Sequence, residues 1–142
     1  MQKLTAAWAR KAESDLDTAG RELRVEEAPN PGAVCLHAQR SALAYLKARL
    51  LQTEVPFPST SHLVVLLELC LEEEPAWEAF RPHLRALNSL AAQLEDPEYM
   101  PDGPTASEAF ELARAFGDSV RMTLGLDGER PEAPTSDAAT AP

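Results

Sequence analysis

The stretch from Cys35 to Leu50, CLHAQRSALAYLKARL, constrains the fold of this chain more than any other segment. It contains neither glycine nor proline and consists mostly of strong helix formers. Its leucine, alanine and cysteine side chains recur at helical spacing and form an apolar stripe wide enough to face two neighbours at once. The pattern predicts a helix over residues 32–52 that lies in the middle of a helical bundle.

Four further segments show helical periodicity, and no segment shows the alternation that is typical of a β-strand. Proline-rich connections separate them, because proline cannot donate the hydrogen bond that continues a helix. These helices are expected over residues 3–26, 63–71, 82–94 and 105–124. The sequence therefore predicts an all-α, up-and-down bundle of four to five helices with a short third helix.

The predicted bundle forms a single domain over residues 1–125. Residues 126–142 are rich in proline, alanine and acidic residues and are expected to be a disordered tail. Hydroxyl groups within residues 59–61 are expected to cap the third helix, and Thr105 or Ser107 to cap the last one.

The net charge of −10 is unevenly distributed along the chain. Residues 1–53 hold eight lysine and arginine residues against six acidic ones, a local charge of +2, so the remainder carries −12. Because neutralised phosphates supply most of the non-specific affinity for nucleic acids, DNA binding is disfavoured. A nucleotide or RNA contact is compatible only with the first two helices.

The protein is expected to be cytoplasmic and to have a well-formed core. The longest apolar run, residues 63–67, is far shorter than the roughly 20 residues of a membrane-spanning helix. Cys35 and Cys70 lie in helical patterns among leucines and are expected to be buried free thiols. Trp8 is expected to anchor the core. No motif predicts a metal site or a cofactor.

Residues 35–48, CLHAQRSALAYLKA, followed by the run Ser61-His62-Leu63, resemble the HEPN domain family. Members of that family carry a His-Ala-Gln-Gln run and a Glu-Lys-x-Leu-Lys-Ala run on the second helix, and Thr-His-x-Leu at the start of the third. The likeness extends over residues 3–125 and implies a HEPN-like helical bundle.

The chain departs from the family pattern mainly at positions that carry charge. Arg40 stands in place of the second glutamine, and Leu43 and Ala44 replace the Glu-Lys pair. Ser61 replaces the threonine before the histidine, and Glu98 stands where small HEPN proteins carry an Arg-Tyr-Pro loop. These replacements weaken the expectation of a family-type anion site.

HEPN ribonucleases carry an Arg-x4-6-His motif that lines an RNA-cleaving cleft in a dimer. The chain has three histidines, His37, His62 and His83, and none follows an arginine at that spacing. The resemblance therefore implies a HEPN domain without the ribonuclease motif.

Polar residues of the stretch that carries the resemblance are the candidates for ligand binding, since their side chains suit anionic oxygens. The candidate ligand-binding residues are His37, Gln39, Arg40, Lys47 and His62.

Each of three candidates also has a structural interpretation. His37 suits a polar interior group, Lys47 an exposed or snorkelling side chain, and His62 a helix cap or interhelical hydrogen bond. His37 and Lys47 stand about 15 Å apart along one helix, so they bind one mononucleotide together only with help from a neighbouring helix. His83, beside a proline, is expected at the surface.

Two functions follow from the resemblance. The first is a prokaryotic, non-catalytic binding or interaction module, expected to be a homodimer and the partner of a minimal nucleotidyltransferase, which serves nucleotide or substrate binding or toxin–antitoxin pairing. The alternative is a HEPN ribonuclease toxin, or a degenerate relative of one, that acts on RNA through His37 or His62 with Arg40. An unrelated helical scaffold is a third hypothesis.

Overall fold

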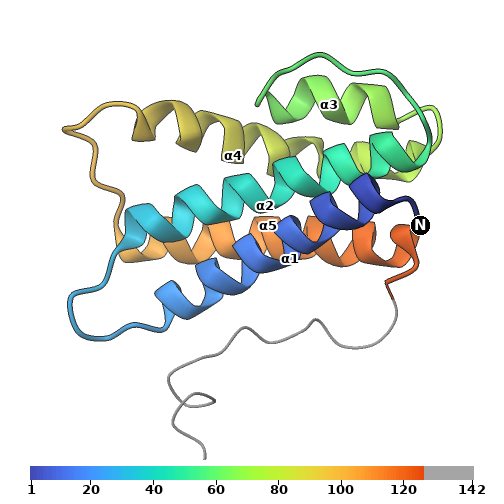
Figure 1. Ribbon diagram of the computed structural model, residues 1–142. Helices are drawn as coiled ribbons and strands as arrows, with labels where there is room; N and C mark the ends of the chain where they lie inside the picture. Colours follow the sequence, from blue (N-terminus) through green and yellow to red (C-terminus); the bar gives the residue numbers. More distant parts are fainter. Residues whose placement is uncertain (127–142) are drawn as a thin grey trace, which may run out of the picture.

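The computed structural model describes residues 1–126, and within this range every regular element is helical (Figure 1). The elements are α1 (Lys3–Leu23), α2 (Pro31–Gln52), α3 (Leu63–Cys70), the short 3₁₀ helix η1 (Pro75–Phe80), α4 (Arg81–Leu94) and α5 (Gly103–Leu124). The prediction of an all-α bundle with a short third helix is confirmed. The predicted tail, apart from its first residue, lies outside the described residues.

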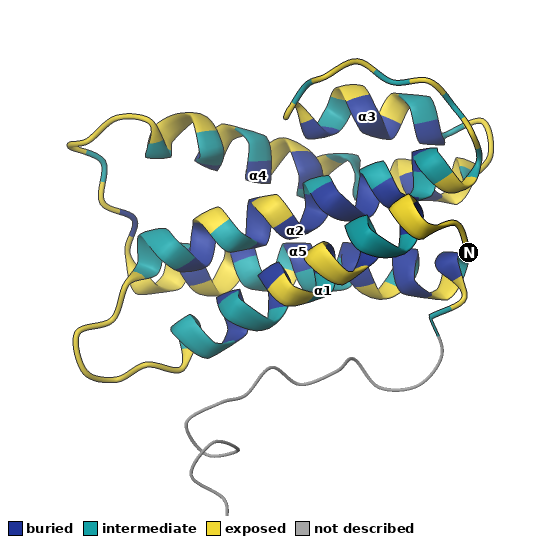
Figure 2. Cartoon of the chain, in the orientation of Figure 1, coloured by how far each residue is buried: buried dark blue, intermediate teal, exposed yellow. Residues whose placement is uncertain are grey.

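Helix α2 is the central helix of the bundle, as its sequence predicts. It packs against α1, α3, α4 and α5, and Figure 1 shows α1 beside it with α5 behind the pair. Most of its apolar residues are fully buried, and its outward turns are exposed (Figure 2). Leu36 is the exception to the predicted stripe, because it lies on the outward side of α2 and is exposed.

An asparagine and an aspartate, rather than hydroxyl groups, cap the starts of α2 and α5. Asn30 caps α2 by accepting from the Ala33 amide at 3.1 Å. Asp102 caps α5 by accepting from the Thr105 amide at 2.8 Å, so the prediction of Thr105 or Ser107 as the cap is wrong. This hydrogen bonding to Thr105 holds the pKa of Asp102 below its usual value.

Two other helix ends also differ from the prediction. The side chain that caps α3 is His62, rather than one of the hydroxyls of residues 59–61. Helix α1 ends at Leu23 instead of residue 26, and positive φ at Ala28 turns the chain before Pro31. Pro29 and Pro31 thus restrict where α1 and α2 are connected, but the last turn of α1 ends several residues before them.

The aromatic centre of the core is Trp77 rather than Trp8. Trp77 is 2% exposed and meets Phe116 edge-to-face, with ring centroids 5.4 Å apart. Trp8 is only partly buried and packs against the edge of the core, so the prediction that it anchors the core is wrong.

Both cysteines are buried free thiols, as predicted. Burial raises the pKa of Cys35 to about 11 and that of Cys70 to about 12. Both thiols therefore stay protonated at neutral pH and serve as apolar packing groups. Within residues 1–126, no helix combines the length and the apolar character that crossing a bilayer requires.

A buried polar network joins α1, α2 and α5. The Tyr45 hydroxyl of α2 donates to Glu13 Oε2 of α1 at 2.5 Å, and the Arg121 guanidinium of α5 pairs with the same carboxylate at 3.2 Å. The Ser41 hydroxyl donates to the Ala12 carbonyl at 2.9 Å. These bonds satisfy polar groups that burial would otherwise penalise, so they fix how α1 lies against α2.

Gly117 of α5 is needed because Tyr45 lies directly against it. A Cβ atom at position 117 would stand 2.8 Å from Tyr45 Cε2 and 3.5 Å from a Leu16 methyl group. The first distance is far inside van der Waals contact, and both Tyr45 and Leu16 are buried. The packing therefore leaves no room for a side chain at this position.

Gly117→Ala is expected to lower the free energy of unfolding by about 1–3 kcal/mol, because the new methyl group overpacks the core. This loss outweighs the gain of roughly 1 kcal/mol that alanine brings to a helix interior. Urea denaturation measures the change. Gly103→Ala is the control, since its Cβ position meets no atom within 4 Å outside its chain neighbours and the backbone of its own helix. Equal stability of the two variants would contradict the packing argument.

Candidate functional site

The structure separates the predicted ligand-binding residues into two groups. His37, Arg40 and Lys47 lie along the part of α2 that borders α1, where His37 contacts Asp15 and Lys47 contacts Trp8. Gln39, also on α2, instead contacts the carbonyl of Ser61, and His62 caps the start of α3. The five residues therefore do not form one site.

His37 is held by a carboxylate of the neighbouring helix. Its Nδ1 lies 2.9 Å from Asp15 Oδ1, and Lys11 Nζ approaches the other oxygen of the same carboxylate at 3.4 Å. Because an ionised carboxylate only accepts hydrogen bonds, Nδ1 carries the proton and donates it to Asp15. The side chain of Asp15 is 9% exposed and that of His37 is 26% exposed. The structural interpretation of His37 is therefore met in part, since the ring is tied to the interior but reaches the surface.

Arg40 follows His37 by three residues and therefore lies beside it, about one helical turn further along α2. It is exposed, and it has no hydrogen-bond or ion-pair partner among residues 1–126. An unpaired guanidinium presents several donors in a planar fork that suits a phosphate or carboxylate group.

Lys47 lies over the indole of Trp8, with Nζ 4.8 Å from the ring centroid. This cation–π contact joins the C-terminal half of α2 to the first turns of α1. The stem of Lys47 is partly buried, which agrees with the snorkelling interpretation. We name the surface formed by Lys11, His37, Arg40 and Lys47 the cationic face.

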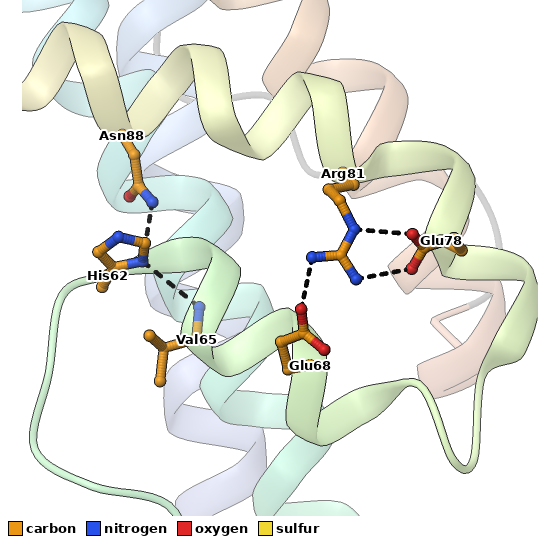
Figure 3. Close-up of polar contacts among 6 residues, drawn as sticks. All are labelled: His62, Val65, Glu68, Glu78, Arg81 and Asn88. Carbon is orange, nitrogen blue, oxygen red and sulfur yellow. Dashed lines mark hydrogen bonds and ion pairs between the residues drawn. The ribbon is translucent and has the colours of Figure 1, made fainter.

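His62 and Gln39 have structural roles, and Figure 3 shows the contacts of His62. His62 Nδ1 accepts from the Val65 amide at 3.4 Å and from Asn88 Nδ2 at 3.0 Å, while Asn88 Oδ1 accepts from the Leu63 amide at 2.9 Å. The prediction that His62 is a helix cap or an interhelical hydrogen bond is confirmed in both forms. Gln39 is 7% exposed and donates to the Ser61 carbonyl at 3.4 Å.

The other end of α3 is held by ion pairs. Arg81 at the start of α4 binds Glu68 of α3 and Glu78 of η1, so one guanidinium bridges three elements (Figure 3). Hydrogen bonds from Arg81 keep the pKa of Glu78 below its usual value. His83 is half-buried against the Phe80 ring, at 5.2 Å between centroids, which corrects its predicted surface position.

Two residues of functional interest, Asp15 and Asn88, escaped sequence reasoning, and Trp8 was expected in the core. Trp8 and Asp15 are seven residues apart and hence on one side of α1, which is the signal that pairs them with α2. Asn88 carries no such signal, because its partners lie 25 and 26 residues away in the sequence.

Neither a metal-ligand cluster nor a groove among the described residues provides a further candidate site. No cluster of three or more histidine, cysteine or carboxylate side chains within residues 1–126 is arranged to hold a metal ion. A shallow groove of about 340 Å³ lies between α4 and α5, and Leu87, Leu90, Tyr99 and Leu112 are among its lining residues. None of the predicted ligand-binding residues lines it.

The described residues form a small all-α bundle domain. The sequence model of the HEPN domain matches residues 5–122, which is most of the chain. The chain belongs to the HEPN domain family, as the motif on α2 indicates. Neither a curated protein nor a solved structure matches the chain.

The Asn88 contact is open to a direct test. Asn88→Ala is expected to cost about 1–3 kcal/mol of local stability at the start of α3, because the Leu63 amide loses its acceptor and His62 loses a partner. Hydrogen exchange at the Leu63 and Val65 amides is the measurement, and both should exchange faster. Gln93→Ala, an exposed change on the same helix, should leave these amides unaffected. Unchanged exchange in the Asn88 variant would show that α3 is held by other contacts.

Proposed function

We propose that this HEPN domain is a non-catalytic binding module that takes a phosphate-bearing ligand, a nucleotide or RNA, on its cationic face. The observation that carries the proposal is the exposed, unpaired guanidinium of Arg40 between His37 and Lys47. A phosphate suits this place because charge-assisted hydrogen bonds to a guanidinium are strong and match its geometry.

Two properties of the surroundings support a nucleotide-like ligand. Trp8 lies under the Lys47 ammonium at the edge of the core, and this contact holds the positive charge at the cationic face. Residues 1–53 carry a local charge of +2 while the rest of the chain carries −12. A polyanion is therefore repelled by most of the molecule and finds attraction mainly at α1 and α2.

The cationic face is also extended rather than compact. His37 and Lys47 are separated by about 15 Å along α2, which exceeds the reach of a single phosphate group. A ligand with several phosphates, or a short single strand, makes better use of such a face than a mononucleotide. The structural roles of His62 and Gln39 remove these two residues from the proposed site.

One observation favours the alternative of RNA cleavage. The hydrogen bond from His37 to Asp15 orients an imidazole in the way that general bases are often oriented. No arginine precedes a histidine at the spacing of the family ribonucleases, however, and Arg40 follows His37 instead of preceding it. We therefore retain binding as the proposed activity.

Removal of cationic side chains tests this proposal. In fluorescence anisotropy with a labelled single-stranded oligouridylate, Arg40→Ala and Lys47→Ala are each expected to weaken binding by roughly tenfold at low salt, because each removes a phosphate contact. The matched controls are Arg85→Ala on α4 and Lys3→Ala at the start of α1, which are both exposed and outside the cationic face. Equal losses in the controls would contradict the proposed site.

Cleavage is followed in the same samples. Intact RNA at high protein concentration agrees with a binding module. RNA cleavage that is lost in a His37→Ala/His62→Ala double variant, and kept in His83→Ala, would replace the proposal with the ribonuclease function.

We further propose that the domain is a homodimer and the partner of a minimal nucleotidyltransferase. Exposed apolar side chains on four helices, Leu4, Leu36, Val65 and Met122, favour association, since contact with a second chain removes apolar area from water. Sedimentation is expected to give twice the chain mass of 15.5 kDa, and a larger species after addition of a nucleotidyltransferase encoded beside it. A 15.5 kDa species at micromolar concentration would contradict the homodimer.

A further inference from the structure

The two ring nitrogens of His37 have different surroundings. Nδ1 is occupied by Asp15, whereas Nε2 has no partner among residues 1–126 and is not among the buried unpaired atoms of this range. It therefore reaches solvent at the cationic face. Because the neutral ring carries its proton on Nδ1, Nε2 presents a lone pair and accepts hydrogen bonds.

Asp15 maintains this tautomer through contacts on both of its oxygens. Oδ1 faces His37 and Oδ2 faces the Lys11 ammonium, and both oxygens of a carboxylate accept hydrogen bonds. The carboxylate itself is largely buried, so its orientation is set by these two partners rather than by water. In the neutral form of His37, Nε2 is thus an acceptor beside the exposed donors of Arg40.

We infer that His37 and Arg40 together select ribose-containing ligands, with His37 Nε2 accepting a hydrogen bond from a ribose 2′-hydroxyl while Arg40 binds the adjacent phosphate. The two residues are three positions apart on one helix, so their side chains lie close enough to contact neighbouring groups of one nucleotide. The 2′-hydroxyl is the group by which a protein tells RNA from DNA. This inference rests on the proposed function of the cationic face.

Asp15 acts as a positioning residue, because it determines which nitrogen of the His37 ring carries the proton. In Asp15→Asn the amide oxygen faces the Lys11 ammonium, which is a donor, and the amide N–H then faces His37 Nδ1. That arrangement moves the imidazole proton to Nε2. The nitrogen at the surface then donates where it accepted before.

Three matched ligands distinguish the two tautomers of His37: an oligouridylate, its 2′-deoxy form and its 2′-O-methyl form. The methyl ether keeps the 2′ oxygen but has no proton to donate. The wild-type protein is expected to bind the ribose form roughly two- to tenfold more tightly than either of the others, which is the range of one hydrogen bond.

Variants of His37 and Asp15 test whether these residues cause the preference for the ribose form. In His37→Ala the ribose form is expected to fall to the affinity of the deoxy form, whose own affinity stays unchanged. In Asp15→Asn the 2′-O-methyl form is expected to rise to the affinity of the ribose form, because Nε2 now donates to the ether oxygen. His83→Ala is the control and should keep the wild-type ratios, and thermal unfolding identifies any variant that fails to fold.

The possible results distinguish the inference from the proposed function. Failure of all three ligands to bind would overturn the proposed function itself. Equal binding of all three by the wild-type protein, or a ribose preference that persists in His37→Ala, would overturn the inference and leave the proposed function standing. Unchanged ratios in Asp15→Asn would overturn the role of Asp15 in setting the tautomer.

Discussion

The contact between Tyr45 of α2 and Gly117 of α5 is the constraint on which the rest of the bundle depends. The ring occupies the space that a side chain at position 117 would need, so it sets how closely the two helices approach. Its hydroxyl donates to Glu13 of α1, and Arg121 of α5 pairs with that same carboxylate. One buried aromatic side chain therefore positions three helices relative to one another.

This arrangement determines what the surface between α1 and α2 presents. Because Tyr45 and Ser41 hold α1 along α2, Asp15 and Trp8 lie beside His37 and Lys47. The buried ion pair between Arg121 and Glu13 adds little net stability, since the cost of desolvating the two charges offsets most of their attraction. Its effect is to favour one alignment of the helices, because any other alignment would leave buried charges unpaired.

The sequence predicted the helices well and their ends less well. Periodicity identified each helix, because the apolar residues must recur at helical spacing to reach a common core. The caps were harder to predict, since capping depends on the backbone angles of the one residue that precedes the helix. His62 caps α3 while Asn88 holds its ring, and Asn88 stands on a different helix. Trp8 was placed in the core for its size, although its position at the edge of α1 leaves it beside Lys47.

The sequence by itself determined the all-α architecture, the central place of α2 and membership of the HEPN domain family. These follow from periodicity and from a local motif, which depend on residues that are close in the chain. Only the tertiary structure decided which candidate residues share a surface. It placed His37 against Asp15, 22 positions away, and it gave Gln39 and His62 structural roles. Side-chain pairing between helices depends on their relative rotation and offset, and packing sets these when the whole bundle forms.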